Sequence, residues 1–292
     1  MPELNPEALP IALLHQQVKR DRQQRSEEHK REVKERGLDQ KTLAERGGRG
    51  PLNLYADGDS WFEYPLSRET IGWLRADGHP TPAINNQAHH GDSAVERLGL
   101  AKRERLIANL NATDHGAYDA LLFSAGGNDI AGDSFVLWIL KYARGMDPAH
   151  GIDRQRLACE LGVIKGAFDD LIAIRDGYDP ECTVFLHGYD FAYPTGIPAC
   201  PSVGPWLKPS LDFQGWTDPT LAQGIVKEAL LAFDRLLTQI EHDHKNVIYV
   251  RTQGTLSSTS DWANELHPTR AGFENIAKKF LGAMRVRFPG RI

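Results

Sequence analysis

The sequence predicts an α/β fold, a three-layer α/β/α sandwich built on a mostly parallel sheet of about five strands. Short apolar runs alternate along the chain with longer segments of helical periodicity, which is typical of a parallel sheet covered by helices on both faces. The chain has 292 residues, of which 41% are hydrophobic and 25% charged. Those values are ordinary for a globular protein and are sufficient for a sizeable core.

Residues 1–50 are predicted to form a charged helical arm and linker outside the core. Residues 19–36 contain 13 charged side chains, eight basic and five acidic, and pairs such as Glu32–Arg36 have the i,i+4 spacing that stabilises a solvated helix. The segment has no apolar stripe to bury, and the glycine-rich residues 47–51 predict a linker. We expect either a mobile extension or an arm that binds an acidic surface or a second subunit, giving a homo-oligomer.

The remaining residues, 51–292, are predicted to form one catalytic domain. Continuous apolar runs predict buried strands at residues 52–56, 81–84, 120–124, 183–186 and 246–251. Between them, apolar side chains recur at intervals of three and four residues, from Leu157 to Ile172 and from Val226 to Ile240. The same spacing predicts a last helix over residues 270–286. Functional side chains of such sheets collect at the carboxyl ends of the strands.

Charge and composition exclude several classes of partner. The net charge of −5 argues against a dedicated nucleic-acid-binding protein, which usually carries a clustered basic excess. No apolar stretch reaches 18 residues and the N-terminus lacks a basic n-region, so neither a membrane span nor a signal peptide is expected. The three cysteines, Cys159, Cys182 and Cys200, form no CxxC pair, which favours a reduced compartment. We therefore expect a cytoplasmic protein.

Three Gly-Asp-Ser tripeptides make Ser60, Ser93 and Ser134 candidate nucleophiles. Ser93 and Ser134 each precede a helical run, so the role of helix N-cap accounts for them. Ser60 instead follows the first predicted strand, at the functional edge of the sheet. No GxSxG motif surrounds any serine, so the nucleophile elbow of the α/β-hydrolases is absent.

Three further residues are, like Ser60, expected at the functional edge of the sheet. Gly91 comes after the second predicted strand, Asn128 after the third, and His267 directly before the last helix. With a serine, a glycine, an asparagine and a histidine in this order over about 210 residues, the sequence resembles the SGNH, or GDSL-type, hydrolases. The resemblance covers residues 52–287 and leaves the arm unexplained.

The resemblance implies a flavodoxin-like SGNH hydrolase fold and a serine esterase that hydrolyses small acyl esters. Ser60 would attack the carbonyl carbon, and His267 would remove its proton. The backbone N–H groups of Ser60 and Gly91 and the side-chain amide of Asn128 would form the oxyanion hole. No metal or organic cofactor is expected, because the adjacent His89 and His90 lack zinc-site spacing, as do the other histidines.

The partner of the histidine departs from the family pattern. SGNH enzymes usually carry Asp three residues before the catalytic His, where this chain has Asn264. An Asn oxygen can accept from Nδ1 but brings no charge to stabilise an imidazolium. We expect Asp261 as the partner, if its loop folds back over His267, with Asn264 as the alternative acceptor and a backbone carbonyl or Glu265 as further possibilities.

Residues 188–219 form an insert that interrupts the alternation of strands and helices. They include six prolines and four glycines, together with Trp206 and Trp216. The segment is too long and too apolar for an ordinary connection, so it is either a lid or pocket wall over the strand ends or a surface loop packed by its own aromatic residues. A dry, lidded pocket would favour acyl transfer, the alternative to hydrolysis. Asn264 motivates a second alternative, a catalytically impaired protein that binds ligands or partners.

Overall fold

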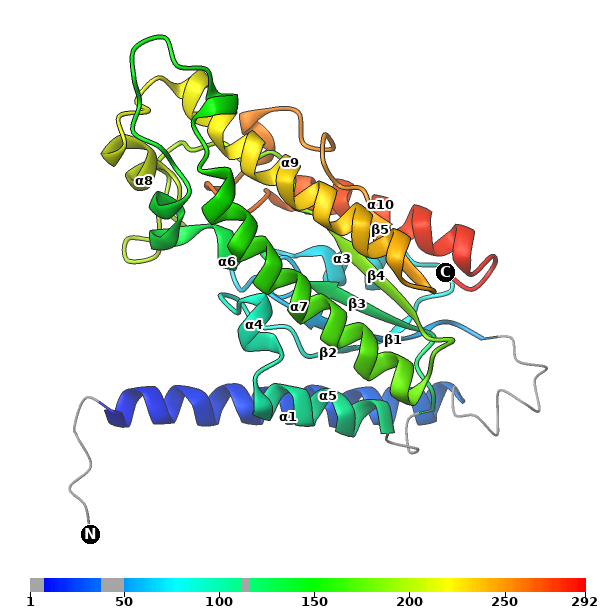
Figure 1. The fold of residues 1–292 in the computed structure, drawn as a ribbon. Helices are drawn as coiled ribbons and strands as arrows, with labels where there is room; N and C mark the ends of the chain where they lie inside the picture. The colour runs from blue at the N-terminus through cyan, green and yellow to red at the C-terminus, as the bar shows by residue number, and fades with distance from the viewer. Residues whose placement is uncertain (1–7, 38–49, 112–115) are drawn as a thin grey trace.

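The computed structural model of the chain describes residues 8–37, 50–111 and 116–292. These residues form a five-stranded parallel sheet with the strand order β2-β1-β3-β4-β5 (Figure 1). The strands are β1 (Asn53–Gly58), β2 (Ala83–Asn86), β3 (Ala120–Ser124), β4 (Thr183–His187) and β5 (Val247–Val250). The predicted parallel sheet is confirmed, and each strand begins and ends within two residues of its predicted run.

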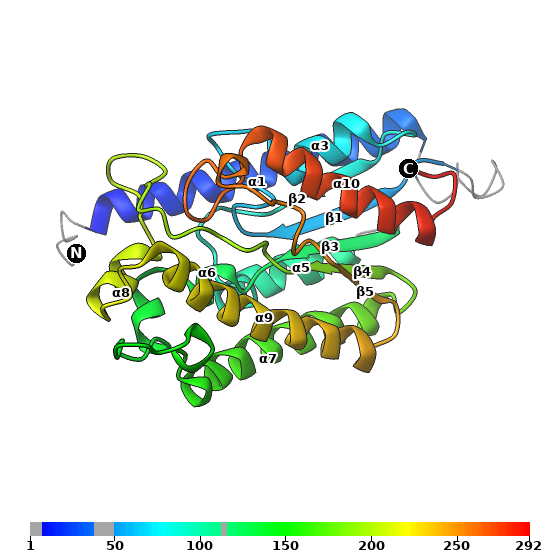
Figure 2. The same ribbon diagram turned by 90° about the horizontal axis from the view of Figure 1, so that it is seen from above.

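Helices cover both faces of the sheet, as Figure 2 shows from above. On one face lie α3 (Thr70–Asp77) and α10 (Arg270–Arg287), and on the other α5 (Leu100–Asn111), α7 (Arg154–Tyr178) and α9 (Pro219–Asp243). Shorter helices are α4 (Ala94–Arg97), α6 (Gly127–Ile130), α8 (Lys208–Phe213) and the 3₁₀ turns η1 (Gly132–Leu137), η2 (Pro148–His150) and η3 (Thr259–Asp261). None of the described helices combines the length and the apolar character that a membrane span requires.

The apolar strand runs form the centre of the core. Every residue of β1, β2, β3 and β4 is buried, and in β5 only Ile248 is partly exposed. Because both faces are covered, the strands read as continuous apolar runs rather than as an alternating pattern. This is why short runs predicted the strands so closely.

Gly58 allows β1 to stay paired with β3 up to its last residue. Its φ is +142°, and a Cβ at this position would overlap the carbonyl oxygen of Ser124 on β3. The next residue, Asp59, donates its backbone N–H to that same oxygen at 2.9 Å. The chain then turns away, which leaves Ser60 at the carboxyl edge of the sheet.

The helix α1 (Ala8–Arg36) lies outside the main core, as expected, but it packs along the edge strand β2 instead of extending away from the domain (Figure 1). Val33 is fully buried beside Ala83. Most of the remaining contact is polar: Arg36 donates to the carbonyl of Thr81 at 2.8 Å, and Arg25 to that of Ala88 at 3.1 Å. An edge strand and its flanks present unpaired carbonyls, so a helix can dock there without an apolar stripe. The predicted linker lies mostly outside the described residues.

Candidate active site

Four segments bring the predicted site residues to the carboxyl edge of the sheet. Ser60 follows β1, Gly91 lies between β2 and α4, Asn128 is in α6 after β3, and His267 directly precedes α10. Parallel strands end at one edge, so residues that are far apart in the sequence meet there.

The Ser60 hydroxyl and the His267 ring are hydrogen-bonded, with Oγ 2.8 Å from Nε2. Ser60 is 7% exposed and His267 is 6% exposed, so the pair is largely shielded from bulk water. The Tyr64 ring stacks on His267 with 4.2 Å between centroids and 11° between planes, and Trp206 packs against the ring edge-on. The aromatic contacts hold the imidazole in the plane that faces Ser60.

Asn264 is the hydrogen-bond partner of the other ring nitrogen, with Oδ1 2.8 Å from Nδ1 of His267. The same oxygen accepts the backbone N–H groups of Leu266 and His267 at 3.1 and 3.0 Å, and the amide nitrogen donates to Tyr64 Oη at 3.0 Å. The amide is therefore held with its oxygen toward His267. Nδ1 then donates, which leaves Nε2 free to accept the Ser60 proton.

The structure corrects our expectation that Asp261 is this partner. Its carboxylate accepts the backbone N–H of Ser258 at 3.0 Å, in a capping box at η3. The turn directs the carboxylate back toward Ser258 instead of toward His267. Only the main chain of Asp261 supports the site, because its carbonyl accepts the N–H of Thr269 at 2.7 Å, two residues after the histidine.

Glu265, the third candidate partner, has a different place. It is fully buried and accepts four backbone N–H groups of the 188–219 insert, from Gly196 (2.9 Å), Trp206 (2.6 Å), Leu207 (2.7 Å) and Lys208 (3.0 Å). The insert is thereby tied to the residue two before His267, and Leu207 lines the pocket beside Ser60. Glu265 thus anchors the wall of the site.

Burial, together with a smaller effect of the charge of His90, lowers the pKa of His267 to about 3. No carboxylate hydrogen-bonds to the ring in the described structure, and so none offsets the loss of hydration of the imidazolium. The imidazole is accordingly neutral near pH 7, as a general base must be before it accepts a proton.

Three of the predicted site residues, Ser60, Gly91 and Asn128, carry hydrogen-bond donors at this edge of the sheet, and Asn128 lines the same pocket as Ser60. Within the described residues, the backbone N–H groups of Ser60 and Gly91 have no hydrogen-bond acceptor. Gly91 has a φ of +81° and open space where a Cβ would stand. Asn128 donates one amide hydrogen to the carbonyl of Asp92 at 2.9 Å, and the amide group carries a second. Free donors next to a nucleophile are what a developing oxyanion requires.

Of the two other Gly-Asp-Ser serines, Ser93 is the helix N-cap that the sequence predicts, whereas the same prediction is wrong for Ser134, which lies inside η1 after the N-cap position at Ala131. Ser93 accepts the N–H of Glu96 at 3.1 Å as the N-cap of α4. Ser134 donates to the carbonyl of Ala131 at 3.3 Å within η1. No histidine hydrogen-bonds to either hydroxyl in the described part of the chain.

A buried polar network beneath Ser60 was not predicted from the sequence. Ser124 donates to Asp59 at 2.7 Å and meets Nε2 of His187 at 2.8 Å, and Tyr189 also donates to Asp59. Burial raises the pKa of Asp59 to about 6, against the hydrogen bonds that it accepts, and burial lowers the pKa of His187 to about 4. The network fixes the residue next to the nucleophile. In the sequence, the only sign of this network is that its residues lie close to the ends of predicted strands.

An apolar pocket of about 60 Å³ opens beside Ser60. Its walls come from α6, η1, α9 and the insert, and it is lined by Asn128, Ile130, Phe135, Leu207, Val226, Leu230 and Trp262, among others. The prediction that the insert forms a pocket wall agrees with this lining. Among the described residues, no group of three or more His, Cys, Asp or Glu side chains is arranged to hold a metal ion.

No protein-family model matches the chain, and no curated protein matches its sequence. Solved structures do match its fold. An extracellular lipase from Streptomyces rimosus is 16% identical, with 80% of this chain and 99% of that chain covered and a TM-score of 0.52. A lipase from a goat rumen metagenome is also 16% identical, with 80% and 97% covered and a TM-score of 0.51. The chain therefore has the fold of these two lipases.

Replacing Glu265 by Gln tests its role as an anchor. The neutral amide can accept fewer of the four N–H groups, so we expect the free energy of unfolding to fall by about 2–4 kcal/mol. Thermal and urea unfolding measure this loss. Glu274→Gln, which removes an exposed i,i+4 pair with Lys278 on α10, is the control and should cost less than about 0.5 kcal/mol. Equal losses in the two variants would contradict the anchor.

Proposed function

We propose that this protein is a serine esterase that hydrolyses esters of short, apolar acyl groups. The observation that carries the proposal is the 2.8 Å contact between Ser60 Oγ and Nε2 of a buried His267. An apolar pocket that Asn128 also lines adjoins this hydroxyl. The fold that the chain shares with two lipases agrees with the same chemistry.

The proposed reaction has two halves. Ser60 Oγ attacks the carbonyl carbon of the ester while His267 takes the hydroxyl proton on Nε2. The carbonyl oxygen becomes an oxyanion, which accepts from the N–H groups of Ser60 and Gly91 and from Asn128. Collapse of this intermediate transfers the proton to the leaving alcohol and leaves an acyl group on Ser60. Water, activated by the neutral His267, then attacks the acyl group and releases the acid.

Asn264 would orient the base without stabilising its charge. Its oxygen selects the tautomer with the proton on Nδ1, which is the one a Ser–His pair needs. It adds no negative charge beside the imidazolium that forms in the transition state. Among the described residues, the group at Nδ1 is the Asn264 dipole rather than a carboxylate, so we expect a slower enzyme than one with Asp at this position.

The size of the pocket supports a short acyl group. A volume of about 60 Å³ is small for a ligand pocket, which favours an acyl chain of a few carbons. Its lining is apolar, so the acyl part, rather than a sugar or a charged group, is the part that it favours. The intact Ser60–His267 contact favours catalysis over a protein that only binds ligands.

Ser60→Ala should abolish turnover of p-nitrophenyl acetate and leave the thermal unfolding midpoint within a few degrees, because only a hydroxyl is lost. Ser93→Ala and Ser134→Ala are the matched controls. They should keep the wild-type turnover, and Ser93→Ala should lose about 0.5–2 kcal/mol of stability as a lost cap. An active Ser60→Ala protein would show that the nucleophile is another residue.

Asn264→Asp should move the acid limb of kcat/KM upward in pH and raise kcat about tenfold at pH 8. In the wild type the lowered pKa of His267 should keep kcat/KM level down to about pH 5, well below the ordinary histidine value of about 6.5. A carboxylate at residue 264 favours the imidazolium and raises the pKa of the histidine. The Tyr64 hydroxyl, which now accepts from the amide, can donate to the new carboxylate oxygen.

The control for this experiment is Asp261→Asn, measured with the same ester between pH 4 and 9. Since the Asp261 carboxylate faces Ser258, we expect less than a threefold change in kcat and no shift of the acid limb. A large loss in Asp261→Asn with none in Asn264→Ala would reverse the assignment of the partner.

A further inference from the structure

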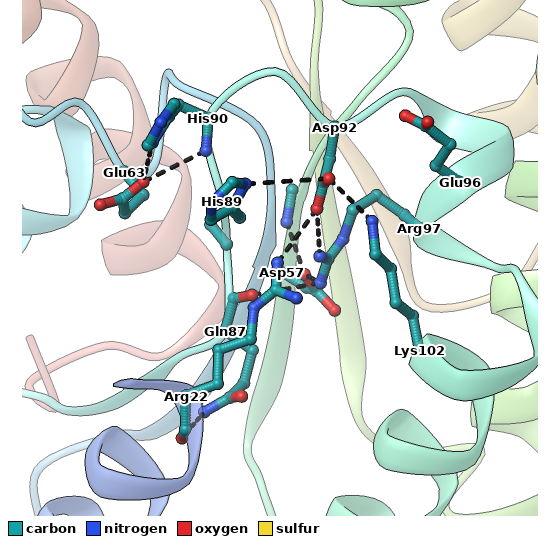
Figure 3. Close-up of polar contacts among 12 residues, drawn as sticks. Arg22, Asp57, Glu63, Gln87, His89, His90, Asp92, Glu96, Arg97 and Lys102 are labelled. Atoms are coloured by element: carbon teal, nitrogen blue, oxygen red, sulfur yellow. Dashed lines mark hydrogen bonds and ion pairs between the residues drawn. The ribbon is translucent and has the colours of Figure 1, made fainter. Parts of the chain in front are cut away.

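The charged helix α1 contacts the segment that carries Gly91, on both sides of that glycine. On one side, Arg22 forms an ion pair with Asp92 at 3.0 Å (Figure 3). On the other, Arg25 donates to the carbonyl of Ala88 at 3.1 Å. Gln87 completes the contact by donating to the carbonyl of Arg22 at 3.2 Å. One turn of α1 therefore holds both ends of a short loop.

Asp92 links this contact to an oxyanion donor. Its carboxylate pairs with Arg22, with Arg97 (2.6 Å) and with Lys102 (2.7 Å), all visible in Figure 3. Its backbone carbonyl accepts from the Asn128 amide at 2.9 Å. A shift of Asp92 would therefore displace Asn128 as well as the adjacent Gly91.

We propose that α1 contributes to the active site. Arg22 and Arg25 act as positioning residues that hold the donors of Gly91 and Asn128 where the oxyanion forms. The inference rests on the proposed esterase function. It assigns a role to the arm, which the resemblance left unexplained. Neither arginine is proposed to touch the substrate.

The loop needs such anchors because Gly91 is flexible. Glycine loses more backbone freedom on ordering than any other residue. Here the N–H that must point toward the oxyanion is that of the glycine itself. Glu63 contributes to the anchoring, since it accepts the N–H of His90 at 3.1 Å and lies 3.6 Å from Arg25. The loop is thus held from the nucleophile segment and from α1.

Arg97 cannot replace Arg22, although both contact Asp92. Arg97 is also paired with the buried Asp57 and donates to the carbonyl of Gln87 at 3.2 Å. Its guanidinium is therefore shared among three acceptors outside α1: Asp92, Asp57 and the Gln87 carbonyl. Arg22 is 5% exposed, so its ion pair with Asp92 is little screened by salt, and it supplies the only hydrogen bond from a described α1 side chain to that carboxylate.

The test compares Arg22→Met and Arg25→Met in the full-length protein, with p-nitrophenyl acetate as substrate. We expect kcat to fall by about ten- to a hundredfold in each, because small misplacements of catalytic donors have effects of this size. KM should change less than about threefold, because the acyl pocket is lined by other elements. Hydrogen exchange of residues 87–93 should quicken, with the rest of the sheet unchanged.

Two controls separate positioning from general destabilisation. Arg31 is exposed and lies nine residues from Arg22, on the opposite side of α1, so Arg31→Met should leave kcat unchanged. Arg22→Lys keeps a cation near Asp92 and should restore kcat to within about threefold of the wild type. Arg22→Met and Arg25→Met proteins with wild-type kcat, or with a loss that Arg31→Met shares, would overturn the inference. A wild-type protein without esterase activity would instead overturn the proposed function itself.

Discussion

The hydrogen bonds at the end of β1 hold the candidate site together. The carbonyl of Gly58 accepts the N–H of His89, and the N–H of Asp59 donates to the carbonyl of Ser124, each at 2.9 Å. The nucleophile segment is therefore tied to the Gly91 loop on one side and to β3 on the other. Because Gly58 has no Cβ, β1 and β3 stay in register to this point.

Charge is distributed unevenly around this site. His267 has no carboxylate partner, and the carboxylates nearby serve the backbone: Glu265 holds the insert, and Asp190 accepts the N–H groups of Gly254 and Leu256 at 2.6 Å. Below the Gly91 loop, by contrast, the carboxylates are paired with cations: Asp92 with Arg22, Arg97 and Lys102, and the buried Asp57 with Arg97. Among the described residues His267 has no such ion pair, and its ring is contacted by the Asn264 amide and the stacked Tyr64 instead.

Local sequence patterns predicted the strands, the long helices and the place of Ser60, Gly91, Asn128 and His267 at one edge of the sheet, because each depends on its own segment. An apolar run marks a strand buried on both faces, and a polar residue after it lies at the sheet edge. The partner of His267 could not be predicted in this way, since it depends on the turn at η3 that directs Asp261 toward Ser258. The network of Asp59, Ser124 and His187 also escaped prediction, because its members come from three strand ends.

The packing of α1 escaped prediction for a different reason, which bears on its role. Periodicity detects helices that bury apolar side chains. This helix instead packs mainly through arginines that donate hydrogen bonds to carbonyls and to one carboxylate of the rest of the domain. Such contacts are directional, and they place a loop more accurately than they stabilise a fold. A helix selected only for stability would be expected to bury an apolar face. The polar face of α1 is better explained by a positioning role: the helix holds the Gly91 loop in place.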